Sequence, residues 1–512
     1  MTLQGIKMTE NMKNAPEDSS ILQKKTSFAG DVFTLVGGTA FAQILAILAT
    51  PILTRLYGPE DFGLLALFLS ITGIFSIIVC LRYELSIMLP ESDEEAANLL
   101  SLSLLIALIF SILTTPIIWF GRQPIQNVLK APQLGAYLWL VPFFIFVSGV
   151  FLALNYWNSR TKHFKRLSAA RITSSVASTG TQLGAGFSGY ATGGSLIGAS
   201  LVGHSVSALI LGGQIWKKDK SLFLRSINLK TMTAGLKRYR KFPLVDSWSA
   251  LMNSVSWQLP VFLLASFFSP GVVGFYSLGF RLLHLPMSFI GSSVSQVFFQ
   301  RASEAKSEGS LASLVENVFR LLVIVGMFPI FTLTIVGSDV FSVIFGAIWT
   351  EAGVYVQILS IWAFVWFISS PLSTLWIIFE KQEFGLRITS INLITRIVSL
   401  WIGGMLGNAR ISLLLFSLSG VLVYGYLCIK MMMTAGVKIS KIKNIIGSNF
   451  ALCLPCGLIL ACLKLFGVSE YILVAISFLF IMGYYIYLLK TNSQINTLLN
   501  RSGMFHKIKR SI

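Results

Sequence analysis

A chain of 512 residues that is 54% hydrophobic and only 12% charged carries about half the charged share of an ordinary soluble domain. That composition excludes a water-soluble globular protein, because no soluble fold covers so much apolar surface. The 40 Lys and Arg exceed the 21 Asp and Glu and give a net charge of +19. Basic loops that orient membrane helices explain this charge, so no nucleic-acid partner is expected.

The first 27 residues are polar and lack a cleavage-site pattern, which predicts a retained cytoplasmic tail and not a signal peptide. After the tail, apolar runs recur whose length matches the roughly 20 residues needed to cross about 30 Å of hydrocarbon. We therefore predict an all-α integral membrane protein of about fourteen transmembrane helices. The predicted spans lie near residues 30–53, 62–81, 97–120, 134–156, 168–188, 194–216, 244–268, 274–299, 316–338, 353–379, 388–407, 411–429, 445–463 and 470–489.

The Lys and Arg residues alternate between the two sides of this predicted topology. The tails and every second loop hold 31 of the 40, the opposite loops hold five, and four lie within spans. Since basic residues gather on the cytoplasmic side, both termini are predicted to be cytoplasmic. One missed or invented helix would destroy the alternation downstream of it.

The longest basic loop divides the chain. Residues 217–243 contain nine Lys and Arg and are expected to lie along anionic lipid headgroups. The predicted organisation is a polar tail (1–28), an N-lobe of six spans (29–216), the basic linker (217–243), a C-lobe of six spans (244–434), an extra pair of helices (445–490) and a basic cytoplasmic tail (491–512).

Two short matches suggest that the lobes are copies of one six-helix unit. Pro59-Glu-Asp-Phe-Gly63 resembles Pro270-Gly-Val-Val-Gly274 at an offset of 211 residues, and Arg171-Ile-Thr-Ser matches Arg387-Ile-Thr-Ser at an offset of 216. Because six is an even number, both copies enter the membrane from the same side. The sequence thus predicts two pseudo-symmetric lobes that can rock about a central cavity.

Charged and polar side chains inside the spans are candidate sites, because an unpaired charge in hydrocarbon is costly. In span 274–299 they recur at steps of three and four residues, which predicts one polar helical face toward an aqueous cavity. The residues of that face are Ser277, Arg281, His284, Ser288, Ser292 and Ser295. Arg396 is the deepest cation and a second candidate for binding an anion. A purely structural pairing of Arg281 with another helix is the alternative.

Further candidates lie at span ends. Arg55 and Arg82 flank the second span and are weighed as substrate contacts, whereas Arg171 is expected to reach lipid headgroups. Asp246 and Glu84 are candidates for binding a coupling H⁺ or Na⁺, with a helix-terminal salt bridge as the alternative. His204 is a third coupling candidate, since its imidazole titrates near neutral pH, with a neutral packing role as the alternative.

The sequence contains no recognisable catalytic motif. H-E-x-x-H, G-x-x-x-x-G-K-[ST] and G-x-S-x-G are absent, and no loop is large enough to fold as a soluble catalytic domain. We therefore expect a transporter and not an enzyme, with no catalytic residues, metal site or cofactor.

Several stretches of the chain resemble the Wzx-type polysaccharide flippases, which share a superfamily with lipid II flippases and MATE multidrug exporters. The resemblance covers roughly residues 28–435 and is most specific in the N-terminal third. It is carried by Thr54-Arg-Leu-Tyr-Gly-Pro-Glu-Asp-Phe-Gly-Leu64, Leu81-Arg-Tyr-Glu-Leu85, Asn158-Ser-Arg160 and Phe164-Lys-Arg-Leu-Ser168.

This resemblance implies two six-helix lobes around a cationic cavity in a bacterial inner membrane. It implies transport of an undecaprenyl-diphosphate-linked oligosaccharide from the cytoplasmic to the periplasmic leaflet, for surface polysaccharides such as O-antigen, capsule or exopolysaccharide. Other polysaccharide-assembly proteins are expected partners. Arginines can replace the water lost by the diphosphate and contact it through two hydrogen bonds each.

Two other functions stay open at this point. A MATE-like drug/cation antiporter would need acidic residues in the cavity. A membrane glycosyltransferase or glycan polymerase would usually carry a sizeable periplasmic loop, and the longest such loop predicted here has only about fourteen residues.

Overall fold

The computed structural model describes residues 17–491, and this part of the chain contains helices and no strand. Residues 1–16 of the predicted N-terminal tail and 492–512 of the predicted C-terminal tail lie outside it. The N-lobe consists of α1 (Glu17–Leu56), α2 (Pro59–Ser76), α4 (Asp93–Val128), α5 (Val141–Arg160), α6 (Phe164–Phe187) and α7 (Gly193–Ser226). The C-lobe consists of α9 (Ser247–Phe267), α10 (Pro270–Pro286), α11 (Ser292–Ser307), α12 (Leu311–Phe345), α13 (Thr350–Ser373), α15 (Gln382–Met405) and α16 (Ala409–Thr434).

Shorter elements join these helices, and two further helices follow the C-lobe. The short elements are α3 (Tyr83–Ser86), η1 (Pro132–Ala136), η2 (Leu138–Leu140), α8 (Leu229–Arg238), η3 (Phe242–Asp246), η4 (Met287–Gly291), η5 (Ala347–Trp349) and α14 (Leu375–Ile378). The predicted extra pair is α17 (Ile439–Leu465) and α18 (Glu470–Thr491). The predicted basic linker is therefore mostly helical, since it contains the end of α7 and all of α8.

Each of the fourteen predicted spans corresponds to a helix, with α10 and α11 together forming one. Among the described residues, twelve of these segments are long and apolar enough to cross a membrane. The two that fall short are α6 and α10, because α6 is rich in Ser, Thr and Gly and α10 has only 17 residues before the π-helical turn η4. Both line the cavity described below.

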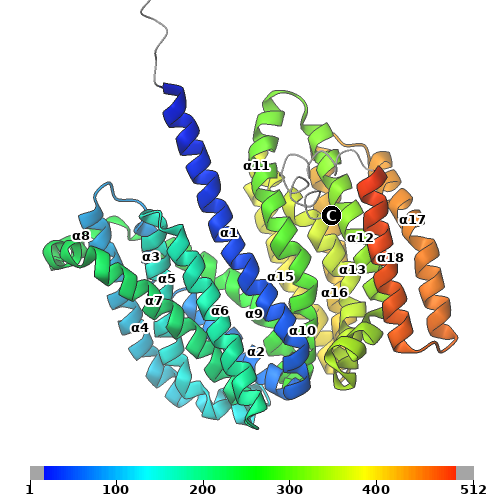
Figure 1. The fold of residues 1–512 in the computed structure, drawn as a ribbon, viewed down its shortest axis with the longest axis horizontal. Helices are drawn as coiled ribbons and strands as arrows, with labels where there is room; N and C mark the ends of the chain where they lie inside the picture. The colour runs from blue at the N-terminus through cyan, green and yellow to red at the C-terminus, as the bar shows by residue number, and fades with distance from the viewer. Residues whose placement is uncertain (1–16, 492–512) are drawn as a thin grey trace, which may run out of the picture.

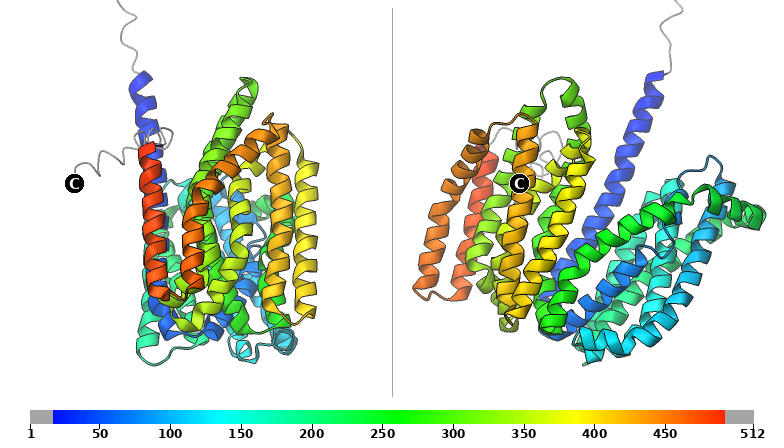
Figure 2. Two further views of the ribbon diagram at one scale, coloured as in Figure 1. Left: turned by 90° about the vertical axis from the view of Figure 1, so that its right-hand side faces the viewer. Right: turned by 180° about the vertical axis from the view of Figure 1, so that it is seen from behind.

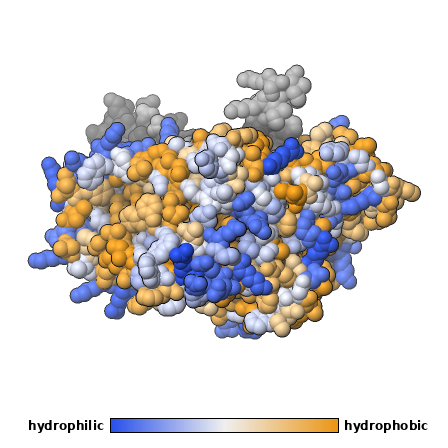
Figure 3. Space-filling view, turned by 90° about the horizontal axis from the view of Figure 1, so that it is seen from below, coloured by the Kyte–Doolittle hydropathy of each residue, from blue (hydrophilic) through white to orange (hydrophobic). Residues whose placement is uncertain are grey.

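The two lobes diverge at the end of the molecule where α1 begins and meet at the opposite end (Figure 1). Figure 2 shows the same arrangement from behind, with α1 standing between the lobes. We call these the splayed end and the joined end. Seen from below, hydrophilic side chains gather near the middle of the joined end, with hydrophobic ones on both sides (Figure 3).

The joined end is built from the two halves of the sequence repeat. A Cβ atom on Gly63 of α2 would lie 1.8 Å from the carbonyl oxygen of Pro270, and one on Gly274 of α10 would lie 1.9 Å from that of Pro59. Residues at equivalent positions of the repeat thus contact one another reciprocally. This relation between α2 and α10 is what a two-fold axis between the lobes requires.

Two side chains also link the lobes across the joined end. The indole Nε1 of Trp349 donates a hydrogen bond to the carbonyl oxygen of Thr54 over 2.9 Å, and its ring packs edge-on against Phe62. Lys130 Nζ donates to the carbonyl oxygen of Phe267 over 2.8 Å. Trp349 and Thr54 are both fully buried, so the contact excludes water.

The extra pair α17 and α18 packs on α12 through polar contacts as well as apolar ones. Pro329 inside α12 has no N–H, so the carbonyl oxygen of Val325 loses its helical partner, and the Tyr485 hydroxyl donates to it over 2.9 Å. In the last turn of α17, Lys464 Nζ contacts Asp339 over 2.6 Å. The pair is thereby attached to the C-lobe alone and leaves the interface between the lobes free.

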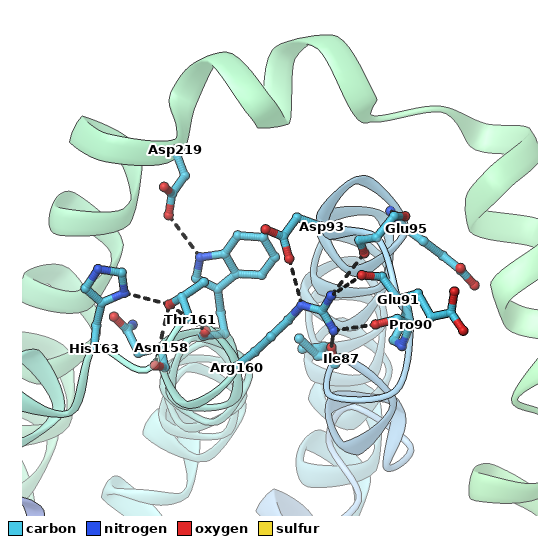
Figure 4. A network of polar contacts seen from close by, with 12 residues as sticks. Ile87, Pro90, Glu91, Asp93, Glu95, Asn158, Arg160, Thr161, His163 and Asp219 are labelled. Carbon is cyan, nitrogen blue, oxygen red and sulfur yellow. Dashed lines mark hydrogen bonds and ion pairs between the residues drawn. The ribbon is translucent and has the colours of Figure 1, made fainter. Parts of the chain in front are cut away.

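Arg160, at the C-terminal end of α5, holds the connection between α3 and α4 (Figure 4). Its Nε contacts Asp93 over 3.1 Å, and its Nη atoms donate to four backbone carbonyl oxygens. Those carbonyls belong to Ile87, Pro90, Glu91 and Ser92. One guanidinium thus uses all five of its donors to fix a loop that has no secondary structure of its own.

We expect Arg160→Ala to destabilise the N-lobe by about 3 kcal/mol, because several partly buried carbonyl groups lose a charged donor at once. Arg160→Lys should recover only part of this, since an ammonium group cannot reproduce the planar fork. Thermal unfolding of the purified protein measures the effect. The matched control is Arg387→Ala, whose exposed ion pair with Glu383 should contribute less than about 0.5 kcal/mol. Equal melting temperatures for the two alanine variants would contradict the role given to Arg160.

Candidate substrate cavity

A cavity of about 950 Å³ lies between the two lobes. Helices α1, α2, α5, α6 and α7 form its N-lobe wall, and α10 with the turn η4 forms its C-lobe wall. Its polar lining residues are Thr39, Gln43, Arg171, Ser174, Ser175, Ser178, Thr179, Gln182, Ser200, His204, Ser207, Arg281, His284 and Ser288. Leu53, Leu65, Leu69 and Phe151 are among the apolar ones.

The charges of this cavity have one sign. Two arginines, Arg171 and Arg281, and two histidines line it, and its lining residues include no Asp or Glu. The cavity therefore favours an anionic ligand.

Arg281 projects from the C-lobe wall. It lies eleven residues after the start of α10, which places it roughly 16 Å along that helix from the joined end. Its side chain is exposed to the cavity and forms no hydrogen bond or ion pair with any residue in the described part of the chain. The alternative of a structural pairing with another helix is not seen in this conformation, so the guanidinium is available to a ligand.

The other predicted residues of this face are only partly brought together. His284 and Ser288 line the cavity with Arg281, and the His284 ring packs 5.2 Å from the ring of Trp366. The hydroxyl of Ser277 is buried without a hydrogen-bond partner and is not part of the lining. Beyond the π-helical turn η4, the Ser295 hydroxyl donates to the carbonyl oxygen of Gly291 over 2.8 Å and is not part of the lining. The side chain of Ser292 lies outside the part of the chain that the structure describes, so its place on this face stays a prediction.

The polar face of α6 was not predicted from the sequence. Arg171, Ser174, Ser175, Ser178, Thr179 and Gln182 line the cavity at steps of one, three and four residues. The same periodic signal that exposed the face of span 274–299 is present here, but small hydroxyl side chains contribute little to it. Arg171 was expected at lipid headgroups and instead lines the cavity, where its Nη1 lies 2.5 Å from the Thr39 hydroxyl.

Arg396 lies inside the C-lobe and not at the cavity surface. It is 3% exposed, and its Cζ atom stands 4.8 Å from the centre of the Trp257 ring and 5.8 Å from that of Phe416. Its Nη2 donates to the Tyr424 hydroxyl over 3.2 Å, while its Nε has no partner. Aromatic rings thus take the place of a counter-ion for this buried cation.

Arg55 and His204 lie in different parts of the N-lobe, and only His204 lines the cavity. Arg55 is exposed in the last turn of α1, at the joined end, and is not part of the cavity lining. His204 lines the cavity, its Nδ1 lies 2.9 Å from the carbonyl oxygen of Ser200, and its ring packs against Phe144. A proton on Nδ1 satisfies that contact and leaves Nε2 as an acceptor.

Arg82, Glu84 and Asp246 come together at the splayed side of the N-lobe, away from the cavity lining. Arg82 Nε donates to Asp246 Oδ2 over 2.7 Å, and Arg82 Nη1 lies 3.6 Å from Glu84 Oε1. Asp246 ends the π-helical turn η3 before α9, so this ion pair ties the first helix of the C-lobe to the N-lobe. The sequence singled out each of these residues as a candidate but did not indicate that Arg82 pairs with Asp246.

The chain around Arg82 is strained and its neighbour Glu84 is desolvated. Leu81 and Arg82 have φ angles of 48° and 64°, in the left-handed region that costs a non-glycine residue about 1 kcal/mol or more. Both carboxylate oxygens of Glu84 are buried without a hydrogen-bond partner. Burial raises the pKa of Glu84 to about 7, against the lowering effect of Arg82. Glu84 lies in α3, between two spans, where it can exchange a proton near neutral pH.

Among the described residues, no group of three or more His, Cys, Asp or Glu side chains is placed to hold a metal ion.

Solved structures of two transporters share this fold. The lipid II flippase MurJ in an inward closed conformation superimposes with a TM-score of 0.67 at 13% identity, covering 89% of this chain and 98% of that one. A multidrug resistance MATE family transporter of the MOP superfamily, in an inward-facing conformation, gives a TM-score of 0.62 at 16% identity, covering 77% of this chain and 94% of that one. The chain thus shares the fold of these two transporters.

The sequence defines the family more narrowly. Residues 52–354 match the family described as "Polysaccharide biosynthesis protein". This segment covers more than half of the chain, so the protein belongs to that family. No curated protein is similar enough in sequence to be matched to the chain.

Proposed function

We propose that this protein is a flippase that moves an undecaprenyl-diphosphate-linked oligosaccharide from the cytoplasmic to the periplasmic leaflet of a bacterial inner membrane. The observation that carries the proposal is the cavity between the lobes, which presents the unpaired Arg281 guanidinium and is lined by no carboxylate. A diphosphate that leaves water must replace its hydrogen bonds, and a guanidinium supplies two of them together with the opposite charge. Membership in the polysaccharide biosynthesis family supports a glycan as cargo.

In the conformation described here, Arg281 with His284 and Ser288 forms the diphosphate site. Arg396 becomes a substrate contact only in a conformation in which Trp257 of α9 moves off its guanidinium. Arg55 and Arg82 contact the substrate at the two ends of the N-lobe, outside the cavity. Ser277 packs behind the cavity wall. The splayed end faces the cytoplasm, in agreement with the excess of basic residues predicted on that side.

The cavity favours this function over the two alternatives. A MATE-like drug/cation antiporter requires negative charge at its binding site, whereas the lining of this cavity is cationic. A glycosyltransferase or polymerase would need a general base to activate a sugar hydroxyl, and no Asp or Glu carboxylate lines this cavity. Surface polysaccharide assembly also implies that other proteins of that process work beside this one.

A deletion strain tests the function in the cell. We expect loss of surface polysaccharide, accumulation of the lipid-linked precursor in the cytoplasmic leaflet and an unchanged drug-resistance profile. A changed resistance profile with normal surface glycans would favour the antiporter. Glycan bond formation by the purified protein would favour the enzyme.

We infer that a proton, bound at Glu84, couples transport to the ion gradient. The charged and titratable groups around this carboxyl are Arg82, Asp246, Tyr156 and Cys80. When Glu84 is neutral, Arg82 pairs with Asp246 alone, whereas ionised Glu84 competes for the same guanidinium. Proton release therefore weakens the ion pair that holds α9 to the N-lobe.

The sign of the pH effect follows from the raised pKa. Between the unfolded value near 4 and about 7, the folded protein binds more protons at Glu84 than the unfolded chain does, so its stability falls as pH rises through that window. Transport should change most steeply near pH 7. Glu84→Gln should remove both effects, while Glu383→Gln, which removes an exposed carboxylate paired with Arg387, should leave them in place. Unaltered pH profiles of unfolding and transport in Glu84→Gln would exclude Glu84 as the coupling site.

A further inference from the structure

The N-lobe wall of the cavity carries free hydrogen-bonding groups that the diphosphate site does not use. The side chains of Gln43 on α1 and of Ser178 and Gln182 on α6 line the cavity and form no hydrogen bond with any described residue. We call these three residues the amide wall. Two primary amides and a hydroxyl provide donors and acceptors without net charge.

The neighbouring hydroxyls show that this wall is rigid. Ser174 donates to the carbonyl oxygen of Gly203 on α7 over 2.7 Å, and Ser175 donates to that of Ala42 on α1 over 2.9 Å. A Cβ atom on Gly203 would lie 2.9 Å from the Ser178 Cβ, so α6 and α7 approach closely. Close packing and bonds between helices hold α6 in place, and the free groups are therefore presented in a fixed geometry.

The opposite wall differs in chemistry. On α10 and η4 the polar lining consists of Arg281, His284 and Ser288, next to the apolar Phe280 and Leu285. The C-lobe wall thus presents an unpaired guanidinium. The N-lobe wall presents mainly uncharged hydrogen-bonding groups beside Arg171, whose guanidinium already contacts the Thr39 hydroxyl. A diphosphate matches the first, and a row of vicinal hydroxyls matches the second, because each sugar hydroxyl both donates and accepts.

We propose that the amide wall receives the sugar residues next to the diphosphate, so that the N-lobe determines which glycan is carried. This inference rests on the proposed function. It adds an orientation for the substrate, with its phosphates on α10 and its glycan on α1 and α6. When α10 moves relative to α6, the two parts of the headgroup follow different lobes.

Binding to the full-length purified protein tests this orientation with two probes. The first is lipid-linked oligosaccharide extracted from cells that lack the protein, and the second is undecaprenyl diphosphate without sugar. We expect the triple variant Gln43→Met, Ser178→Ala and Gln182→Met to bind the first probe at least tenfold more weakly and the second within about twofold of the unsubstituted protein. Arg281→Ala should weaken the binding of both.

Controls and single variants keep the test decisive. Thr173→Ala changes a hydroxyl on the exposed side of α6 and should bind both probes normally. If the triple variant does not fold, Gln182→Met alone should show the same selective loss at a smaller size. Equal weakening of both probes, or no weakening of either, would overturn the amide wall as a sugar site. Failure of the unsubstituted protein to bind either probe would instead overturn the proposed function.

Discussion

Gly63→Ala and Gly274→Ala should each reduce transport by tenfold or more without preventing membrane insertion. The added methyl group would lie 1.8 or 1.9 Å from a carbonyl oxygen of the partner helix, far inside contact distance. Because alanine is a better helix former than glycine, neither α2 nor α10 is weakened as a helix. The cost of about 1–3 kcal/mol falls on the contact between the lobes. Surface polysaccharide in a deletion strain that carries each variant measures the loss.

Accessibility of the joined end shows whether this loss has the expected cause. In a variant free of native cysteines, Thr54→Cys should be protected from a membrane-impermeant thiol reagent and should become reactive when Gly63→Ala is added, because Thr54 is buried there. Gly198→Ala on α7 is the matched control, since a Cβ at that glycine would meet nothing within 4 Å. Full transport by both glycine variants would mean that the joined end does not need to close in this way.

Arg281→Ala should lower substrate affinity by about a hundredfold. A diphosphate in the cavity would lose two charge-assisted hydrogen bonds, together about 3 kcal/mol. Arg281→Lys should retain part of the affinity, because it keeps the charge but cannot bind with two parallel N–H groups. Titration of the purified protein with undecaprenyl diphosphate gives these values.

The control for this experiment is a cation of the same lobe that does not line the cavity. Arg387→Ala removes an exposed charge paired with Glu383 and should leave the affinity within about twofold. If Arg387→Ala and Arg281→Ala weakened binding equally, the effect would come from net charge and the diphosphate site would lie elsewhere.

Much of the architecture could be predicted because membrane helices reveal themselves in long apolar runs. The fourteen spans, the even number of helices per lobe and the repeat at Gly63 and Gly274 all depend on local sequence. The face containing Arg281 could be predicted for the same reason, since one large charged residue marks a helical period clearly. The α6 face, built from small hydroxyls around Ser178, gave too weak a signal.

Other parts of the site depend on contacts between distant segments. Arg82 and Asp246 are 164 residues apart, and nothing near either residue indicates its partner. Arg396 appears in the sequence as a deep cation, but its burial under the rings of Trp257 and Phe416 follows from the packing of α9 and α16 against α15. The π-helical turn η4 after Pro286 interrupts the regular helical period of this span, and residue periodicity does not show it.

Translocation by the purified protein in liposomes is the most direct test of a cationic cavity that carries a lipid-linked glycan. Labelled lipid-linked oligosaccharide is placed in one leaflet, and its appearance in the other is followed for the unsubstituted protein and for Arg281→Ala. We expect rapid appearance with the former and a loss of about a hundredfold with the latter. Equal rates for the two proteins, or no movement with either, would contradict a cationic cavity that carries the lipid-linked glycan.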